Sequence, residues 1–116
     1  MTSNIDFIAL CNLDEVSGGT IGSATLPNGR RVAIYLVGGE AFATEDSCSH
    51  GASSLADEGC LEGHIVECGM HLGTFDVRTG EAVGPPCTKA LRTYPVEIRG
   101  GQVMLSTAAL PAELRQ

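Results

Sequence analysis

The chain alternates between short apolar runs and pairs of turn-forming residues. The pattern predicts strands over residues 5–10, 20–26, 31–37, 40–44, 64–68, 74–77, 81–83, 91–99 and 102–106. Asn28-Gly29, Gly38-Gly39 and Gly100-Gly101 stand between neighbouring runs and supply the positive φ angles that tight hairpins need. Many glycines between short apolar runs are typical of a turn-rich antiparallel fold, so the sequence predicts an all-β protein that begins as a meander.

The remaining segments are expected to be irregular. Residues 13–19 read as a loop, and residues 52–63 are polar with small side chains and no helical period, with a turn near Asp57. Arg78-Thr79-Gly80 predicts a further hairpin, Gly84-Pro85-Pro86 is too stiff for a central strand, and residues 107–116 form a helical turn or fray. A chain of 116 residues is one domain by length.

Charge narrows the classes of partner. The formal net charge is −7 and the isoelectric point about 4.7, which disfavours nucleic acid as a partner because phosphate binding needs clustered Lys and Arg. An acidic surface favours partners with a basic docking face. The first six residues lack the basic start of a signal peptide, and the longest apolar run, residues 32–37, is far too short to cross a bilayer. We therefore expect a cytoplasmic protein without membrane contact.

The candidate chemistry lies in two short motifs. Cys48-Ser49-His50 and Cys68-Gly69-Met70-His71 each supply one thiol and one imidazole, with seventeen residues, 51–67, between His50 and Cys68. Soft thiolate and imidazole ligands select zinc, copper or an iron–sulfur cluster over magnesium or calcium. Alternation along an extended segment would point Cys48 and His50 the same way. The sequence thus predicts a metal site, for which a structural zinc Cys₂His₂ module is one interpretation.

The two motifs, in this order and at this spacing, with Gly51 and Gly73 after the ligands, resemble the Rieske family. The likeness extends over nearly the whole chain, and residues 68–80 are similar to the small Rieske-type ferredoxins of bacterial aromatic-ring dioxygenases. It implies an antiparallel β-sandwich or meander base, residues 1–44 and 87–116, with a small inserted cluster-binding subdomain, residues 45–86.

The resemblance also implies one [2Fe–2S] cluster. Cys48 and Cys68 would hold one iron, and His50 and His71 the other. Glycines at positions 51 and 73 allow close backbone approach to such a cluster. Pro85 and Pro86 resemble the proline loop that covers the cluster in this family, although a stiff surface turn is an equal interpretation.

As a function, the resemblance implies a monomeric one-electron carrier that is not itself an enzyme. It would receive electrons from a flavin-dependent NADH ferredoxin reductase and deliver them to a terminal ring-hydroxylating dioxygenase in aromatic compound catabolism. The alternatives are the small Rieske-like subunit of an assimilatory nitrite reductase and the zinc module. No Ser/His/Asp set or phosphate-binding glycine loop suggests catalysis by this chain.

Two departures from the respiratory branch of the family bear on redox potential. Respiratory Rieske proteins carry an extra cysteine in each ligand loop, which residues 51–53 and 69–70 lack here. That branch also has Ser and Tyr hydroxyls after the last histidine, where this chain has Gly73 and Phe75. Loss of two hydrogen-bond donors to sulfur predicts a potential near the low end of the Rieske range, roughly −150 mV.

Other cysteine, histidine and acidic residues could also take part in the chemistry of the site. Cys11, Cys60 and Cys87 are expected to be reduced thiols, with a Cys60–Cys87 disulfide as the alternative. His64 is expected to be a partly exposed residue outside the ligand set. The insert also contains a group of acidic residues, expected to form a solvated surface or, alternatively, a docking site: Asp46, Asp57, Glu58, Glu62 and Glu67.

Overall fold

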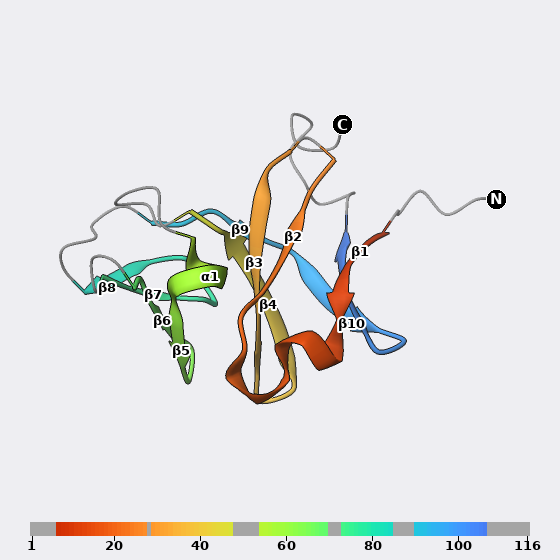
Figure 1. Cartoon of the computed structure of the whole chain (residues 1–116), viewed down its shortest axis with the longest axis horizontal. Helices are drawn as coiled ribbons and strands as arrows, with labels where there is room; N and C mark the ends of the chain where they lie inside the picture. Colours follow the sequence, from red (N-terminus) through yellow and green to blue (C-terminus); the bar gives the residue numbers. More distant parts are fainter. Residues whose placement is uncertain (1–6, 28, 48–53, 70–72, 85–89, 107–116) are drawn as a thin grey trace.

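The computed structural model describes residues 7–27, 29–47, 54–69, 73–84 and 90–106 (Figure 1). In chain order the elements are β1 (Phe7–Asn12), η1 (Leu13–Gly19), β2 (Gly22–Thr25), β3 (Arg31–Val37), β4 (Glu40–Glu45), α1 (Leu55–Glu58), β5 (Cys60–Glu62), β6 (Ile65–Glu67), β7 (Thr74–Asp76), β8 (Ala82–Gly84), β9 (Thr93–Tyr94), β10 (Val96–Arg99) and β11 (Gln102–Ser106). The predicted all-β class is confirmed. In this described part of the chain, no helix has the length and apolar character that crossing a bilayer requires.

The strands form three antiparallel sheets. The terminal sheet has the order β1-β11-β10, the meander sheet β2-β3-β4-β9, and the insert sheet β5-β6-β7-β8. Figure 1 shows the meander sheet in the middle, with the insert sheet on one side and the terminal sheet on the other. The insert sheet is built only from residues 60–84, between the predicted ligand motifs and just beyond them.

Strand β3, in the middle sheet, has a nearly continuous apolar sequence because both of its faces are buried. Val32 and Ile34 belong to the core shared with the terminal sheet, whereas Ala33 and Tyr35 belong to the core shared with the insert sheet. All four are fully buried. Successive side chains of a strand point to opposite faces, so a strand covered on both faces needs no polar alternation.

Two predicted hairpins are confirmed. Gly38 and Gly39 have φ angles of 60° and 84° between β3 and β4, and Gly100 and Gly101 have 57° and 79° between β10 and β11. Positive φ at both central residues matches the right-handed twist of the flanking strands, which is why glycine pairs are favoured there.

Residues 13–19 contain 3₁₀ helix interrupted by non-helical backbone at Ser17 and Gly18, so the prediction of a loop was wrong for part of the segment. The carboxylate of Glu15 accepts a hydrogen bond from the Asn12 backbone N–H at 3.0 Å, and the Ser17 hydroxyl donates to the Leu13 carbonyl at 3.0 Å. Val16 is fully buried in the core beneath the terminal sheet. Local side-chain hydrogen bonds and one buried anchor therefore order a segment whose composition resembles a loop.

The irregular segment predicted after the first ligand motif also contains regular structure. Helix α1 has only four residues, and its first turn is capped where the Ser54 hydroxyl accepts from the Asp57 N–H at 3.1 Å. Leu55 is fully buried in the core under the insert sheet. Strand β5 follows directly. Such a short helix depends on packing and capping, since its own hydrogen bonds are too few to sustain it.

The predicted strand over residues 91–99 is divided in two. Strand β9 pairs with β4 through Ala43–Tyr94, whereas β10 pairs with β11 through Val96–Leu105. Pro95 lies between them and has no N–H to donate, so the ladder breaks there and the chain passes from one sheet to the other.

The two tyrosines of the chain are both buried but differ in hydrogen bonding. The Thr44 hydroxyl donates to the Glu45 carbonyl at 2.8 Å, so it must accept from the Tyr35 hydroxyl, also at 2.8 Å. The Tyr94 hydroxyl is buried and has no hydrogen-bond partner among the described residues.

This difference predicts unequal effects of the same substitution. Tyr35→Phe is expected to lower the free energy of unfolding by about 1 kcal/mol, because it removes a buried hydrogen bond. Tyr94→Phe should change it by less than about 0.5 kcal/mol or stabilise the protein, because no bond is lost. Denaturant unfolding of both variants measures this, and equal destabilisation would contradict it.

Alkaline unfolding provides a second measurement. Burial raises the pKa of Tyr35 well above its ordinary value of 10.0. Above pH 10 the unfolded chain loses this proton while the folded chain keeps it, so stability falls as pH rises, by up to about 1.4 kcal/mol per pH unit. Tyr35→Phe should flatten the fall between pH 10 and 12. An unchanged slope would show that Tyr35 ionises normally in the folded state.

Candidate metal centre

The ends of the first ligand loop are held together. Ser47 and Ser54 face each other in an antiparallel bridge on either side of residues 48–53. The Asp46 carbonyl accepts a hydrogen bond from the Leu55 N–H at 2.8 Å. Cys48, His50 and Gly51 lie outside the described residues. The described residues on either side of positions 48–53 are thus held together.

The second ligand loop is closed in a similar way. Cys68 follows strand β6 and is fully buried, and its N–H donates to the Gly73 carbonyl at 2.8 Å. Gly73, which is also buried, leads into strand β7. His71 lies outside the described residues. The β6–β7 hairpin therefore places the Cys68 thiol in an apolar, enclosed position.

Helix α1 brings the two loops together. A Cβ added at Gly69 would collide with the backbone oxygen of Glu58, the last residue of α1. A Cβ at Gly59 would lie 2.6 Å from the Leu55 carbonyl oxygen. The start of the second ligand loop is therefore in direct backbone contact with the helix that follows the first, and glycine is needed for this approach.

Asp46 is not part of a solvated acidic surface, so that expectation was wrong for this residue. Asp46 is only 4% exposed. One carboxylate oxygen accepts from the Ala56 N–H at 2.8 Å and the other lies 3.3 Å from Nη1 of Arg31. A buried carboxylate is tolerated only when it is paired and hydrogen-bonded, as here.

Arg31 joins several of these groups. Its guanidinium makes two contacts to the Asp57 carboxylate, at 3.2 and 3.3 Å, and donates to the Ser54 hydroxyl at 3.3 Å. The Nη2 atom of Arg31 also donates to the Ser23 hydroxyl on β2 at 3.1 Å. These hydrogen bonds hold the pKa of Asp57 below its usual value. Sequence reasoning missed Arg31 and Ser54, although Ser54-x-x-Asp57 has the spacing of a helix-capping motif.

The other acidic residues of the insert agree better with a solvated surface. Asp57, Glu58 and Glu62 are exposed, and Glu67 is half-buried.

The two described thiols outside the ligand motifs are both free. Cys60 is exposed on β5 and forms no disulfide with another described residue, and the alternative of a Cys60–Cys87 bond stays a prediction. Cys87 itself lies outside the described residues. Burial, and then the nearby Glu15 charge, raise the pKa of the Cys11 thiol. Cys11 therefore stays protonated in the core, which is the inert state expected for it.

His64 has a packing role. It lies in the turn before β6, half-buried, with its ring edge-on to Phe42 at 5.7 Å between ring centres. Its carbonyl accepts from the Val77 N–H at 2.9 Å. His64 thus connects the insert sheet to the meander sheet, and its intermediate burial agrees with the expectation of a partly exposed residue.

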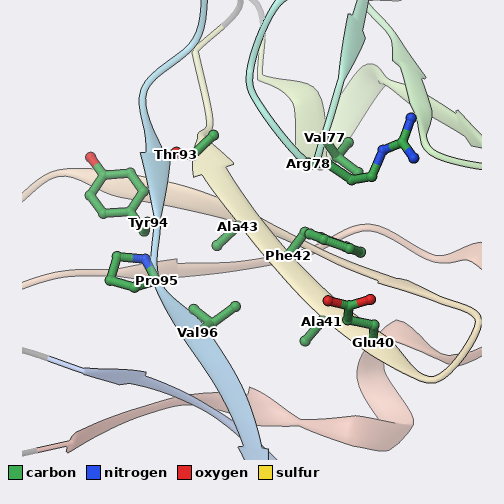
Figure 2. A pocket seen from close by; sticks show the side chains of 10 residues that line it. All are labelled: Glu40, Ala41, Phe42, Ala43, Val77, Arg78, Thr93, Tyr94, Pro95 and Val96. Atoms are coloured by element: carbon green, nitrogen blue, oxygen red, sulfur yellow. The ribbon is translucent and has the colours of Figure 1, made fainter. Parts of the chain in front are cut away.

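A hollow of about 460 Å³ lies at the junction of these two sheets (Figure 2). Phe42 and Arg78 lie on one side of strand β4, and Tyr94 and Val96 on the other. Arg78 is paired with Asp76 at 2.8 Å, so its charge is already neutralised. Cys68, the predicted ligand that lies among the described residues, does not line this hollow.

One predicted donor lies among the described residues. The thiol of Cys68 is fully buried and is of the chemical type that an iron–sulfur cluster requires, and Gly69 beside it lies against the Glu58 backbone. Among the described residues no three His, Cys, Asp or Glu side chains gather as a competing metal site. Three of the four predicted ligands lie outside those residues, so their assignment stays a prediction.

The all-β fold, with Cys68 buried at the end of a hairpin strand, agrees with the setting expected for an iron–sulfur domain. The model of the Rieske [2Fe-2S] domain matches residues 6–95, and the chain belongs to this family. The expected fold and the expected Rieske-type [2Fe–2S] cofactor are confirmed.

The chain is similar to several known ferredoxins. The ferredoxin component of the p-cumate 2,3-dioxygenase system of Pseudomonas putida is 48% identical over 106 residues, which cover 91% of this chain and 90% of the relative. The structure of a Sphingomonas yanoikuyae B1 ferredoxin matches with a TM-score of 0.80 and 37% identity, covering 87% of this chain and 98% of the other. A complex of reduced oxygenase and oxidised ferredoxin in carbazole 1,9a-dioxygenase matches with a TM-score of 0.78 and 37% identity, covering 86% and 92%.

Proposed function

We propose that this protein is the one-electron carrier of a bacterial aromatic-ring dioxygenase system. The observation that carries the proposal is the 48% identity to a dioxygenase ferredoxin across nearly the full length of both chains. The fold supports it, since the sheets support two ligand loops and leave no place for a second, catalytic domain within the 116 residues. A carrier of this kind transfers electrons and makes no substrate bond itself.

The proposed ligands are Cys48 and Cys68 for one iron and His50 and His71 for the other, and the bound cluster supplies reversible uptake of one electron. Gly51 and Gly73 would permit close backbone approach, and Pro85 and Pro86 would cover the site. Residues 45–86 would form the cluster-binding subdomain on a base of residues 1–44 and 87–116. The insert sheet, which draws all its strands from residues 60–84, supports this division.

The proposed partners are a flavin-dependent NADH ferredoxin reductase and a terminal oxygenase. A related ferredoxin has been seen in complex with the oxygenase of carbazole 1,9a-dioxygenase. The net charge of −7 favours docking to basic faces on both partners. We propose that the carrier works as a monomer in the cytoplasm, where NADH is available and thiols such as Cys11 and Cys60 stay reduced.

The test is a reconstituted electron-transfer assay with the purified, anaerobically prepared protein. It should be red-brown, give a Rieske-type EPR spectrum on reduction with dithionite, and support oxygenase turnover at a rate that falls as salt increases. A colourless protein that carries zinc would instead favour the structural module. Isolation of the natural protein in a stable large complex, with no free small form on gel filtration, would favour a nitrite reductase subunit.

The absent hydroxyls near the cluster lead to a separate prediction. Phe75→Tyr is expected to raise the reduction potential by about 20 to 60 mV, because one hydrogen bond of about 0.5–1.5 kcal/mol would stabilise the reduced state. Phe75 is fully buried between its strand partners Val66 and Ala82. Gly73→Ser should act in the same direction. Protein-film voltammetry measures both.

Phe42→Tyr is the matched control, since it adds the same hydroxyl to a ring packed on His64, outside the ligand loops. Its potential should stay within about 10 mV of the parent protein. If Phe75→Tyr shifts the potential no more than this control, the missing hydroxyl has no part in setting the potential.

A further inference from the structure

The first ligand loop has an ionic anchor at its base. We define the Arg31 anchor as Arg31, Asp46, Ser54 and Asp57. Asp46 lies two residues before Cys48, and Ser54 and Asp57 follow the loop, as the N-cap and in the first turn of α1. Arg31 itself belongs to β3 of the meander sheet. A single guanidinium thus contacts residues on both sides of the loop.

Three further hydrogen bonds strengthen the anchor, one within it and two that connect it to the rest of the protein. The Arg31 carbonyl accepts from the Asp46 N–H at 3.1 Å, and the Arg31 side chain donates to Ser23 on the neighbouring strand at 3.1 Å. The buried Asp46 carboxylate also accepts from the Ala56 N–H of α1. The guanidinium of Arg31 is a planar, fixed array of donors, and only arginine can offer such an array to several acceptors at once.

Helix α1 extends the effect of the anchor to the second loop. The first turn of α1 is bound by Arg31 through Asp57, while its last residue, Glu58, meets Gly69 beside Cys68. The helix is only four residues long, so a shift at one end moves the other. Arg31 is therefore placed to influence the separation of the two ligand loops from a position outside either loop.

We propose that Arg31 is the positioning residue of this metal centre: through Asp46, Ser54 and Asp57 it clamps the two described ends of the first ligand loop and fixes α1 against Gly69, at the start of the second ligand loop. The inference rests on the proposed ligand roles of Cys48 and His50. Arg31 touches no proposed ligand in the described residues and acts through its neighbours. Outer partners of this kind affect metal affinity because they orient the groups that bind it.

The test compares three holoprotein variants. Arg31→Met keeps the length of the side chain and removes its charge and donors. Asp57→Asn weakens one arm at an exposed position. Arg99→Met is the matched control, because Arg99 is similarly exposed and forms an ion pair with Glu97 in the terminal sheet. The readouts are the loss of visible absorbance in excess EDTA, the EPR g values of the reduced protein, and far-UV circular dichroism.

Arg31→Met is expected to accelerate cluster loss about 10-fold or more, and to broaden or shift the g values, while circular dichroism stays that of the parent. Asp57→Asn should act in the same direction by a smaller factor, and Arg99→Met should stay within about 2-fold. If Arg31→Met fails to fold, the test is the comparison of cluster loss and g values between Asp57→Asn and Arg99→Met. Cluster loss and g values equal to those of Arg99→Met would overturn the inference. A parent protein without a cluster would instead overturn the proposed function.

Discussion

Cys68→Ala is expected to yield a folded but colourless protein, with at least about 100-fold less [2Fe–2S] cluster than the parent. Changes to groups that only orient metal ligands already reduce affinity by about 10- to 100-fold, so loss of a ligand should exceed that range. Cys68 is fully buried at the end of β6, and its N–H closes the second loop on Gly73. The backbone bond survives the substitution, so the fold should survive as well. Visible absorption, iron and acid-labile sulfide measure the result.

Cys60→Ala and Cys11→Ala are the matched controls. Cys60 is an exposed free thiol on β5, opposite Glu67, the residue directly before Cys68. Cys11 is a buried free thiol in the other core. Both variants should keep a full cluster. If Cys68→Ala retained the cluster, or Cys60→Ala lost it, the proposed ligand set would be wrong.

Gly69→Ala is expected to lower the free energy of unfolding by about 3 kcal/mol or more, at the upper end of the range for overpacking. The added methyl group would collide with the backbone oxygen of Glu58, which cannot move without displacing α1. The apparent melting temperature of the holoprotein should fall by roughly 10 °C or more. Because α1 and Cys68 must separate, the variant should also release its cluster faster. Thermal unfolding followed at visible and far-UV wavelengths separates the two effects.

Gly63→Ala is the control for Gly69→Ala. Gly63 lies in the turn between β5 and β6 with a φ of +60° and no atom within 4 Å of an added Cβ. Its substitution carries backbone strain alone, about 1–2 kcal/mol, and should leave cluster retention unchanged. Equal cluster loss in the two variants would show that contact with α1 is not what makes Gly69 necessary.

Much of the fold is visible in the sequence because it depends on neighbouring residues. The glycine pairs at positions 38–39 and 100–101 dictate hairpins through φ angles that other residues rarely adopt. The elements that the sequence did not predict depend on distant partners. Helix α1 is ordered by Arg31, 23 residues before its cap Ser54, and β5 exists because Ile65–Glu67 pairs with it. Contacts between residues so far apart cannot be predicted from local composition.

The candidate site shows the same division. The two Cys and His motifs predict a metal site without any coordinates, because thiolate and imidazole ligands favour zinc, copper or an iron–sulfur cluster. Their resemblance to the Rieske family, in order and spacing, then implies the [2Fe–2S] cluster. The role of Asp46 was not predicted, since an acidic residue in a polar insert is most simply solvated. Burial beside Arg31 and the Ala56 N–H reverses that interpretation.

By itself, the sequence determined a thiolate–imidazole metal site and the alternation of strands with tight turns, because these follow from the chemistry of single side chains and from the φ angles of adjacent residues. The family and the cofactor followed from the resemblance of the two motifs, in their order and spacing, to the Rieske family. Only the tertiary structure decided that the strand after Leu91 changes sheets at Pro95, that the middle sheet is covered on both faces, and that an arginine on β3 holds the base of a ligand loop. Each of these depends on groups that come together only when the chain folds. Their energies therefore belong to pairs of distant residues, which no stretch of the sequence contains alone.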